Sequence, residues 1–131
     1  GYGVSNEYGP AAIEALHVEI DTWHNVYNGN TELHSDPTPE NHIAICLNGD
    51  PGNCPLWTEV PSIEDMEWHD ISIDIKGYHI VVTLDGEIVL DEDIPGFEFR
   101  GGYIGFSGST GYYSNYHRFD DLWIVQACVV P

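Results

Sequence analysis

The chain has 131 residues, of which 42% are hydrophobic and 12% aromatic, which is enough to bury the core of one domain. Its formal net charge is −19 at pH 7, because 22 acidic residues stand against three fixed cations, Lys76, Arg100 and Arg118. A polyanion repels phosphate backbones and anionic lipid, so we expect neither nucleic acid as a partner nor membrane insertion. Two explanations of the charge stay open: an acidic surface suited to solubility or a salty habitat, and bound cations that relieve the repulsion.

The first half of the chain predicts two strands separated by loops. Residues 1–12, rich in Gly, Tyr and Pro, predict a loop, and residues 13–23 predict the first strong strand. A long polar connection, residues 24–41, is of the kind that carries function. It leads into a second strand, "HIAICL", at 42–47, and residues 48–62 then predict another loop.

The second half predicts further strands and no helix. "EWHDISIDIK" alternates isoleucines with polar residues, which predicts a half-buried strand. Asp85-Gly86 stands between two apolar runs and predicts a hairpin. No stretch has a sustained helical period, and we find no internal repeat and no linker, so one all-β sandwich is expected. The strands of this half are expected at 67–76, 79–84, 87–92, 101–109 and 118–130.

The three cysteines bear on the cellular compartment. Cys46 and Cys54 enclose "LNGDPGN", a turn-forming stretch short enough for a local disulfide, although two unrelated thiols are the alternative. Cys128 is then left over, either as a buried thiol or as the partner of a segment outside this chain. A disulfide would indicate an oxidising compartment. The chain begins without Met, as a mature or cut fragment would.

The stretch "VEIDTWHN", residues 18–25, places acidic and amide side chains on a strand with apolar neighbours. A Glu-x-Asp pair on one strand face would suit a glycosidase, whose two carboxylates stand about 5–5.5 Å apart in the retaining enzymes. Glycosidases of this kind need another carboxylate two to three residues further on, and here those positions hold Trp23 and His24. A hydrolase would therefore have to recruit a distant carboxylate such as Glu32 or Asp120. None of the seven histidines stands in a motif with a nucleophile.

A metal site explains the same residues better. Oxygen-rich donor sets suit calcium, whereas a set with histidine among carboxylates suits manganese or another transition ion. Buried carboxylates need a partner charge, and this chain has almost no Lys or Arg to supply one. The candidate donors lie close together in the sequence: Glu19, Asp21, Asn25, Asp36 and His42.

"VEIDTWHN" and "DPTPENHIAI" resemble the metal-binding strand and loop of the L-type (legume-lectin-like, concanavalin A-like) lectins, closest in pattern to bacterial and extracellular members. "GGYIGFSGSTGYYSNYHRFDDLWI" is similar to a later strand and loop of that family, and the initial "GYG", with Gly3, to its Gly-rich turn. The resemblance covers essentially the whole chain. It implies a concanavalin A-like antiparallel β-sandwich of the jelly-roll kind, incomplete here because the family fold takes roughly 200 to 250 residues. The chain corresponds to the C-terminal part, and another chain or segment would supply the N-terminal strands.

The resemblance also implies a set of site residues. Asn25 would donate its amide to a sugar hydroxyl, Gly3 would lie at the ligand, and Tyr112 and Tyr113 would stack on a sugar ring. A transition ion, usually manganese, would be held by Glu19, Asp21, Asp36 and His42. A calcium ion would be held by Asp21, Asn25, Asp36 and the backbone carbonyl of Trp23.

The function implied is a calcium-dependent, carbohydrate-binding extracellular domain without catalysis, with glycans as partners. The alternative is a structural or adhesive module of an extracellular filament or surface layer, which keeps the lectin fold and the calcium site but not sugar binding. Because a partial sandwich leaves sheet edges open, a homo-oligomer or filament is expected in either case.

Overall fold

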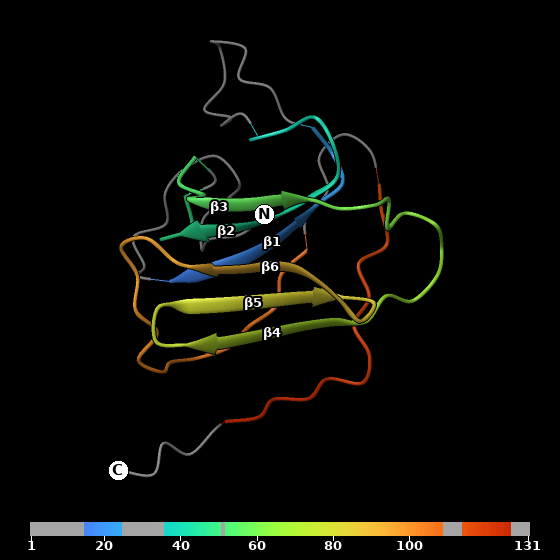
Figure 1. Ribbon diagram of the computed structural model, residues 1–131. Coiled ribbons are helices and arrows are strands. Elements are labelled where there is room, and N and C mark those ends of the chain that lie inside the picture. The colour runs from blue at the N-terminus through green and yellow to red at the C-terminus, as the bar shows by residue number, and fades with distance from the viewer. Residues whose placement is uncertain (1–14, 25–35, 51, 109–113, 127–131) are drawn as a thin grey trace.

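The computed structural model describes residues 15–24, 36–50, 52–108 and 114–126. In these residues six strands form two antiparallel three-stranded sheets, and no helix is present (Figure 1). The first sheet has the order β1-β2-β3, from β1 (Leu16–Asp21), β2 (His42–Leu47) and β3 (Leu56–Glu59). The second has the order β4-β5-β6, from β4 (Ile71–Lys76), β5 (His79–Leu84) and β6 (Glu87–Asp93).

One apolar cluster joins the two sheets. Successive side chains of a strand point to opposite faces, and on β5 every second residue is buried. Since the buried residues of β2 and β5 belong to the same cluster, the apolar faces of both sheets share one core, as in a β-sandwich. The buried members are Ile43, Ile45, Leu47, Val60, Ile80, Val82, Leu84, Leu90 and Ile94.

The first sheet has a second, polar face, which the register of β1 against β2 defines. All six residues of β2 are buried, so this central strand is covered on both sides. Its antiparallel partner positions are Asp21 opposite His42, Glu19 opposite Ala44, and His17 opposite Cys46. Because directly opposed residues project from the same face, the polar side chains of β1 gather on the side away from the apolar cluster.

The hairpin between β5 and β6 confirms the prediction from Asp85-Gly86. Leu84 pairs with Glu87, so the connection has two residues. Both have positive φ, 50° at Asp85 and 85° at Gly86, as a type I′ turn requires. The turn also holds the start of β4, because the Asp85 amide donates to the Asp70 carbonyl at 2.8 Å and the Asp70 amide to Asp85 Oδ1 at 2.9 Å.

The segment 48–62, expected to be a loop, contains β3. Leu56 and Thr58 are half-buried while Trp57 and Glu59 are exposed, so the four residues alternate as a strand does. So short an alternation is hard to recognise among the turn residues on either side. The predicted disulfide is confirmed: Cys46 of β2 is bonded to Cys54 just before β3, across the turn that joins the two strands. Cys128 lies outside the described residues.

The strands expected at 101–109 and 118–130 are wrong for the residues described, 101–108 and 118–126, which form no strand. Positive φ values interrupt the extended backbone at three positions: Gly101 (95°), Gly102 (155°) and Asp121 (48°). The apolar residues of both segments are exposed, including Tyr103 and Trp123.

The two C-terminal segments nevertheless lie side by side in antiparallel order. The ring centroids of Phe106 and Phe119 are 4.8 Å apart. A Cβ added to Gly108 would lie 2.9 Å from the Cβ of His117, so the backbone there passes directly against this side chain. Gly108 follows Phe106 by two residues, and His117 precedes Phe119 by two residues. The two segments therefore run in opposite directions, as the arms of a hairpin do.

Replacing Gly86 with Ala should destabilise the fold. A residue with a Cβ is strained by roughly 1–2 kcal/mol in the left-handed region, so we expect G86A to lower the free energy of unfolding by about that amount in urea titrations. G105A is the matched control, because a Cβ at Gly105 would meet nothing within 4 Å and no positive φ is required. Equal stabilities of the two variants would contradict this account of the turn.

Two histidines lie between pairs of aspartates in the second sheet and its flanking loop. Hydrogen bonds to the carboxylates raise the pKa of His79 and of His69 above the ordinary value of 6.5. All these groups are partly exposed, so solvent weakens each interaction. The distances are 2.7 Å from His79 Nδ1 to Asp93 Oδ1, 2.9 Å from His79 Nε2 to Asp91 Oδ1, 2.8 Å from His69 Nδ1 to Asp85 Oδ2 and 3.1 Å from His69 Nε2 to Asp65 Oδ1.

These bridges predict a pH dependence of stability. A folded-state pKa above the unfolded value means that the stabilisation is complete below about pH 6.5 and is lost as pH rises through the raised pKa. We expect the free energy of unfolding of the double variant H69Q/H79Q to approach that of the wild type as pH rises from 6 to 8. Urea titrations at several pH values measure this difference. A constant difference across that range would contradict the prediction.

Candidate metal centre

Three predicted donors meet at one end of the first sheet. Asp21 is the last residue of β1, His42 is the first residue of β2, and the register places them opposite each other. Asp36 comes from the segment that precedes β2. One ligand atom from each of the three lies within 4.8 Å of the other two. Asp21 and Asp36 are half-buried, whereas His42 is only 1% exposed.

His42 presents a ring nitrogen that the described protein atoms do not satisfy. Its Nδ1 lies 3.0 Å from the Glu40 carbonyl oxygen, which can only accept, so Nδ1 carries a hydrogen and Nε2 of the neutral ring has a lone pair. Nε2 is buried and makes no hydrogen bond with any residue in the described part of the chain. A buried polar atom left in this way costs about 1–3 kcal/mol, and coordination of a metal ion would remove that cost.

The charge of the site also fits a cation. Two carboxylates and an imidazole come together, and their oxygen and nitrogen donors are atoms that attract a cation. The fixed cations of the chain are engaged or lie elsewhere: Lys76 ends β4, Arg100 contacts Glu98 at 2.7 Å, and Arg118 lies 5.0 Å from the ring centroid of Tyr116. Two oxygens and one imidazole nitrogen suit a divalent ion that accepts both donor types, such as manganese, while calcium would need further oxygens.

The segment that carries Asp36 is tied to β3. The Thr38 hydroxyl, in a residue only 5% exposed, donates to Glu59 Oε1 at 2.7 Å and accepts from the Glu40 amide at 3.3 Å. The Val60 amide donates to the Asn41 carbonyl at 2.9 Å. These contacts attach two residues between Asp36 and His42, Thr38 and Asn41, to the end of β3 and the residue after it. Sequence reasoning missed Thr38, whose position between two prolines in "DPTPEN" was the available signal.

The backbone after β1 turns around Asp21. The Trp23 amide donates to Asp21 Oδ1 at 2.7 Å, which fixes the direction of that carboxylate, and the Trp23 indole is 59% exposed. Of the other predicted site residues, four lie outside the described part of the chain: Gly3, Asn25, Tyr112 and Tyr113.

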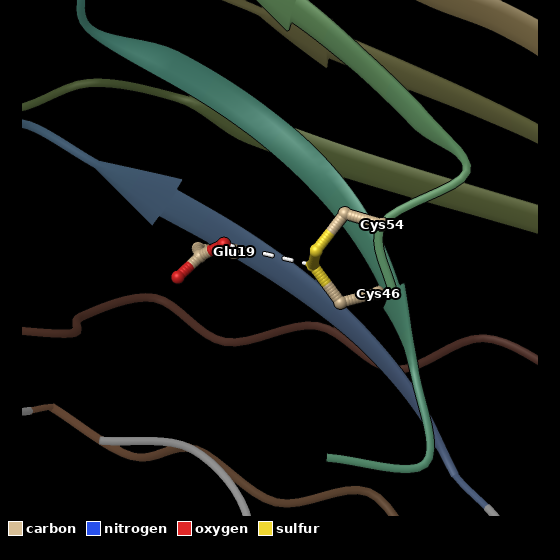
Figure 2. A group of neighbouring side chains, drawn as sticks. All are labelled: Glu19, Cys46 and Cys54. Atoms are coloured by element: carbon tan, nitrogen blue, oxygen red, sulfur yellow. Dashed lines mark hydrogen bonds between the residues drawn. A yellow bond between two sulfur atoms is a disulfide. The ribbon is translucent and has the colours of Figure 1, made fainter. Parts of the chain in front are cut away.

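Glu19 does not join the three donors. Its carboxylate belongs to a second group of possible ligands, with Cys46 and Cys54, and Oε2 lies 3.6 Å from Cys46 Sγ (Figure 2). A disulfide sulfur has no hydrogen to donate and is not a thiolate, so this is a packing contact and the group is no metal site while the bond is closed. Across from Cys46 lies His17, and burial lowers the pKa of its imidazole below the ordinary value.

Comparison with protein-family models, with curated proteins and with solved structures found no match to this chain. Within the described residues we find no helix with the length and hydrophobicity needed to cross a membrane.

Removing the Thr38 hydroxyl should loosen the segment that carries Asp36. A hydrogen bond to a charged group contributes about 1.5–3 kcal/mol, and the partial exposure of Glu59 reduces this, so we expect T38V to lower the free energy of unfolding by about 1–2 kcal/mol. T38S keeps the hydroxyl and should stay close to wild type in the same urea titration. A T38V variant as stable as T38S would show that this bond contributes nothing.

Proposed function

We propose that this chain is a metal-dependent carbohydrate-binding domain of the L-type lectin kind, without catalysis, built on a concanavalin A-like sandwich and acting outside the cell. The convergence of Asp21, Asp36 and His42, together with a buried His42 Nε2 that makes no hydrogen bond with the described residues, carries this proposal. These are three of the residues that the resemblance assigns to ions. The disulfide fits the oxidising compartment that an extracellular domain occupies.

In this proposal the ion organises the surface and the protein binds the sugar. The residues that would hold a transition ion are Asp21, Asp36 and His42, and Asp21 and Asp36 would be shared with calcium. The bound ions would fix the segments around them, so that few groups of the protein need to be ordered when a sugar arrives. The exposed indole of Trp23, two residues from Asp21, supplies an apolar face of the kind that packs against a pyranose ring.

Metal removal tests the site directly. A ligand that binds only the folded state at 100 times its Kd adds about 2.7 kcal/mol, which in a domain of this size shifts the midpoint of a thermal melt by on the order of 10 °C. We expect a chelator to lower the midpoint and calcium, manganese or both to restore it.

The variant D36N should melt at the chelated midpoint whether or not metal is added. D74N is the matched control, since Asp74 is an exposed aspartate on β4, far along the chain from the three donors, and D74N should respond as the wild type does. A wild-type melt that ignores chelator, calcium and manganese would overturn the metal site and the proposal that depends on it.

Sugar binding needs its own measurement. We expect the calcium-loaded chain to bind a subset of immobilised glycans, to be released by chelator and to be displaced by the free sugar. Affinity at each site is expected to be weak, so the chain should be presented in several copies on one support. Metal binding without any glycan signal would contradict the lectin function while leaving the ion site intact.

One observation favours the alternative, a structural or adhesive module. β4 is an edge strand, and Ile71 and Ile73, which project from the same face as the buried Val82 and Leu84, remain 38% and 44% exposed. An open edge with apolar side chains can pair with another chain. Concentration-dependent assembly, measured by light scattering, together with no glycan preference would favour this module over the lectin.

A further inference from the structure

Glu64 links two distant parts of the chain next to the candidate metal centre. Its Oε1 accepts a hydrogen bond from the Thr22 hydroxyl at 3.0 Å and another from the Asn115 side-chain amide at 2.7 Å. Thr22 and Asn115 are 42 and 51 residues away from Glu64 in the sequence. Thr22 directly follows the metal-ligand candidate Asp21, so a single oxygen atom connects the end of β1 to the C-terminal part of the chain.

Few other contacts of the described residues hold the segment around Asn115 in position. Residues 114–126 are exposed throughout and form no strand. Within the segment, the Tyr116 amide donates to Asn115 Oδ1 at 2.7 Å, so the side chain that Glu64 holds also holds the next backbone amide. The Phe106–Phe119 contact places Asn115 in the connection between two antiparallel arms. Glu64 therefore holds Asn115 and Tyr116 at the end of the sheet where Asp21, Asp36 and His42 meet.

We propose that Glu64 is a positioning residue that couples the metal centre to residues 114–116, so that ion binding places Asn115 and Tyr116 for ligand recognition. This inference rests on the proposed function. Movement of Asp21 towards an ion moves the adjacent Thr22, and the shared acceptor transmits that movement to Asn115. Because both donors are neutral and the acceptor is ionised, the two hydrogen bonds are of the stronger, charge-assisted kind.

Titration of the ¹⁵N-labelled full chain with calcium, and separately with chelator, tests the coupling by NMR. In the wild type we expect the backbone amide signals of the non-proline residues within 36–42 to shift together with the Asn115 side-chain amide and the Tyr116 backbone amide, with one apparent Kd. In E64A the signals of residues 36–42 should still shift, with the Kd raised up to about tenfold, as for weak outer-shell changes. The signals of Asn115 and Tyr116 should then no longer respond.

Two further variants separate the hydrogen bonds from charge and from general stability. E64Q keeps a carbonyl oxygen that can accept both hydrogen bonds, so the response of Asn115 and Tyr116 should return. E67A removes the same charge from an exposed glutamate of the same loop and should behave as the wild type does. A purely structural role for Glu64 would broaden or shift the signals of E64A throughout but would leave the calcium response of Asn115 in place.

The outcomes distinguish the two proposals. If residues 36–42 of the wild type respond neither to calcium nor to manganese, which would broaden the signals around its site, the ion site fails and the inference fails with it. If residues 36–42 respond and Asn115 and Tyr116 do not, or if Asn115 and Tyr116 still respond in E64A, the inference alone is overturned. An E64Q variant that behaves as E64A does would also overturn it, because the acceptor oxygen would then not be what matters.

Discussion

The candidate metal centre depends on the antiparallel pairing of β1 with β2. This register places Asp21 opposite His42 and puts both on the face away from the apolar cluster. Since side chains alternate along a strand, a slip of one residue would turn Asp21 into the core and expose the apolar side chains. The same pairing sets His17 opposite Cys46, so the disulfide and the donor group are arranged along one polar face.

The parts of the fold that could be predicted from the sequence are those that local chemistry determines. Asp85-Gly86 specifies its hairpin because both residues adopt positive φ readily, and Cys46 and Cys54 are close enough along the chain to bond with little entropy loss. β3 was missed because its four residues alternate too briefly to be recognised. The apolar residues at 101–109 and 118–130 predict strands, but such a pattern indicates only which side chains avoid water. In the described parts of these segments, positive φ at Gly101, Gly102 and Asp121 interrupts the extended backbone.

The candidate site also has one part that the sequence predicts and another that only the structure reveals. Asp21, Asp36 and His42 could be named from residue types, spacing and a family resemblance, and the structure brings their ligand atoms together. Glu19 was grouped with them because it shares the face of Asp21, whereas its carboxylate lies at the disulfide. Of the residues that hold the site in place, Thr38 has only its position between two prolines as a sequence signal, and Glu64 has none. Their bonds connect positions 21 to 51 residues apart, and only the folded chain determines such contacts.

His42 belongs to a strand that is buried along its whole length, and this bears on kinetics as well as on affinity. An exposed ligand can exchange its ion by rotating a side chain into water. The imidazole of His42 has no such path, because the ring moves only if β2 separates from its neighbours at that end. The lifetime of an ion bound there would follow the rate at which this end of the sheet opens, so residence time would report on local unfolding rather than on the strength of the coordinate bonds.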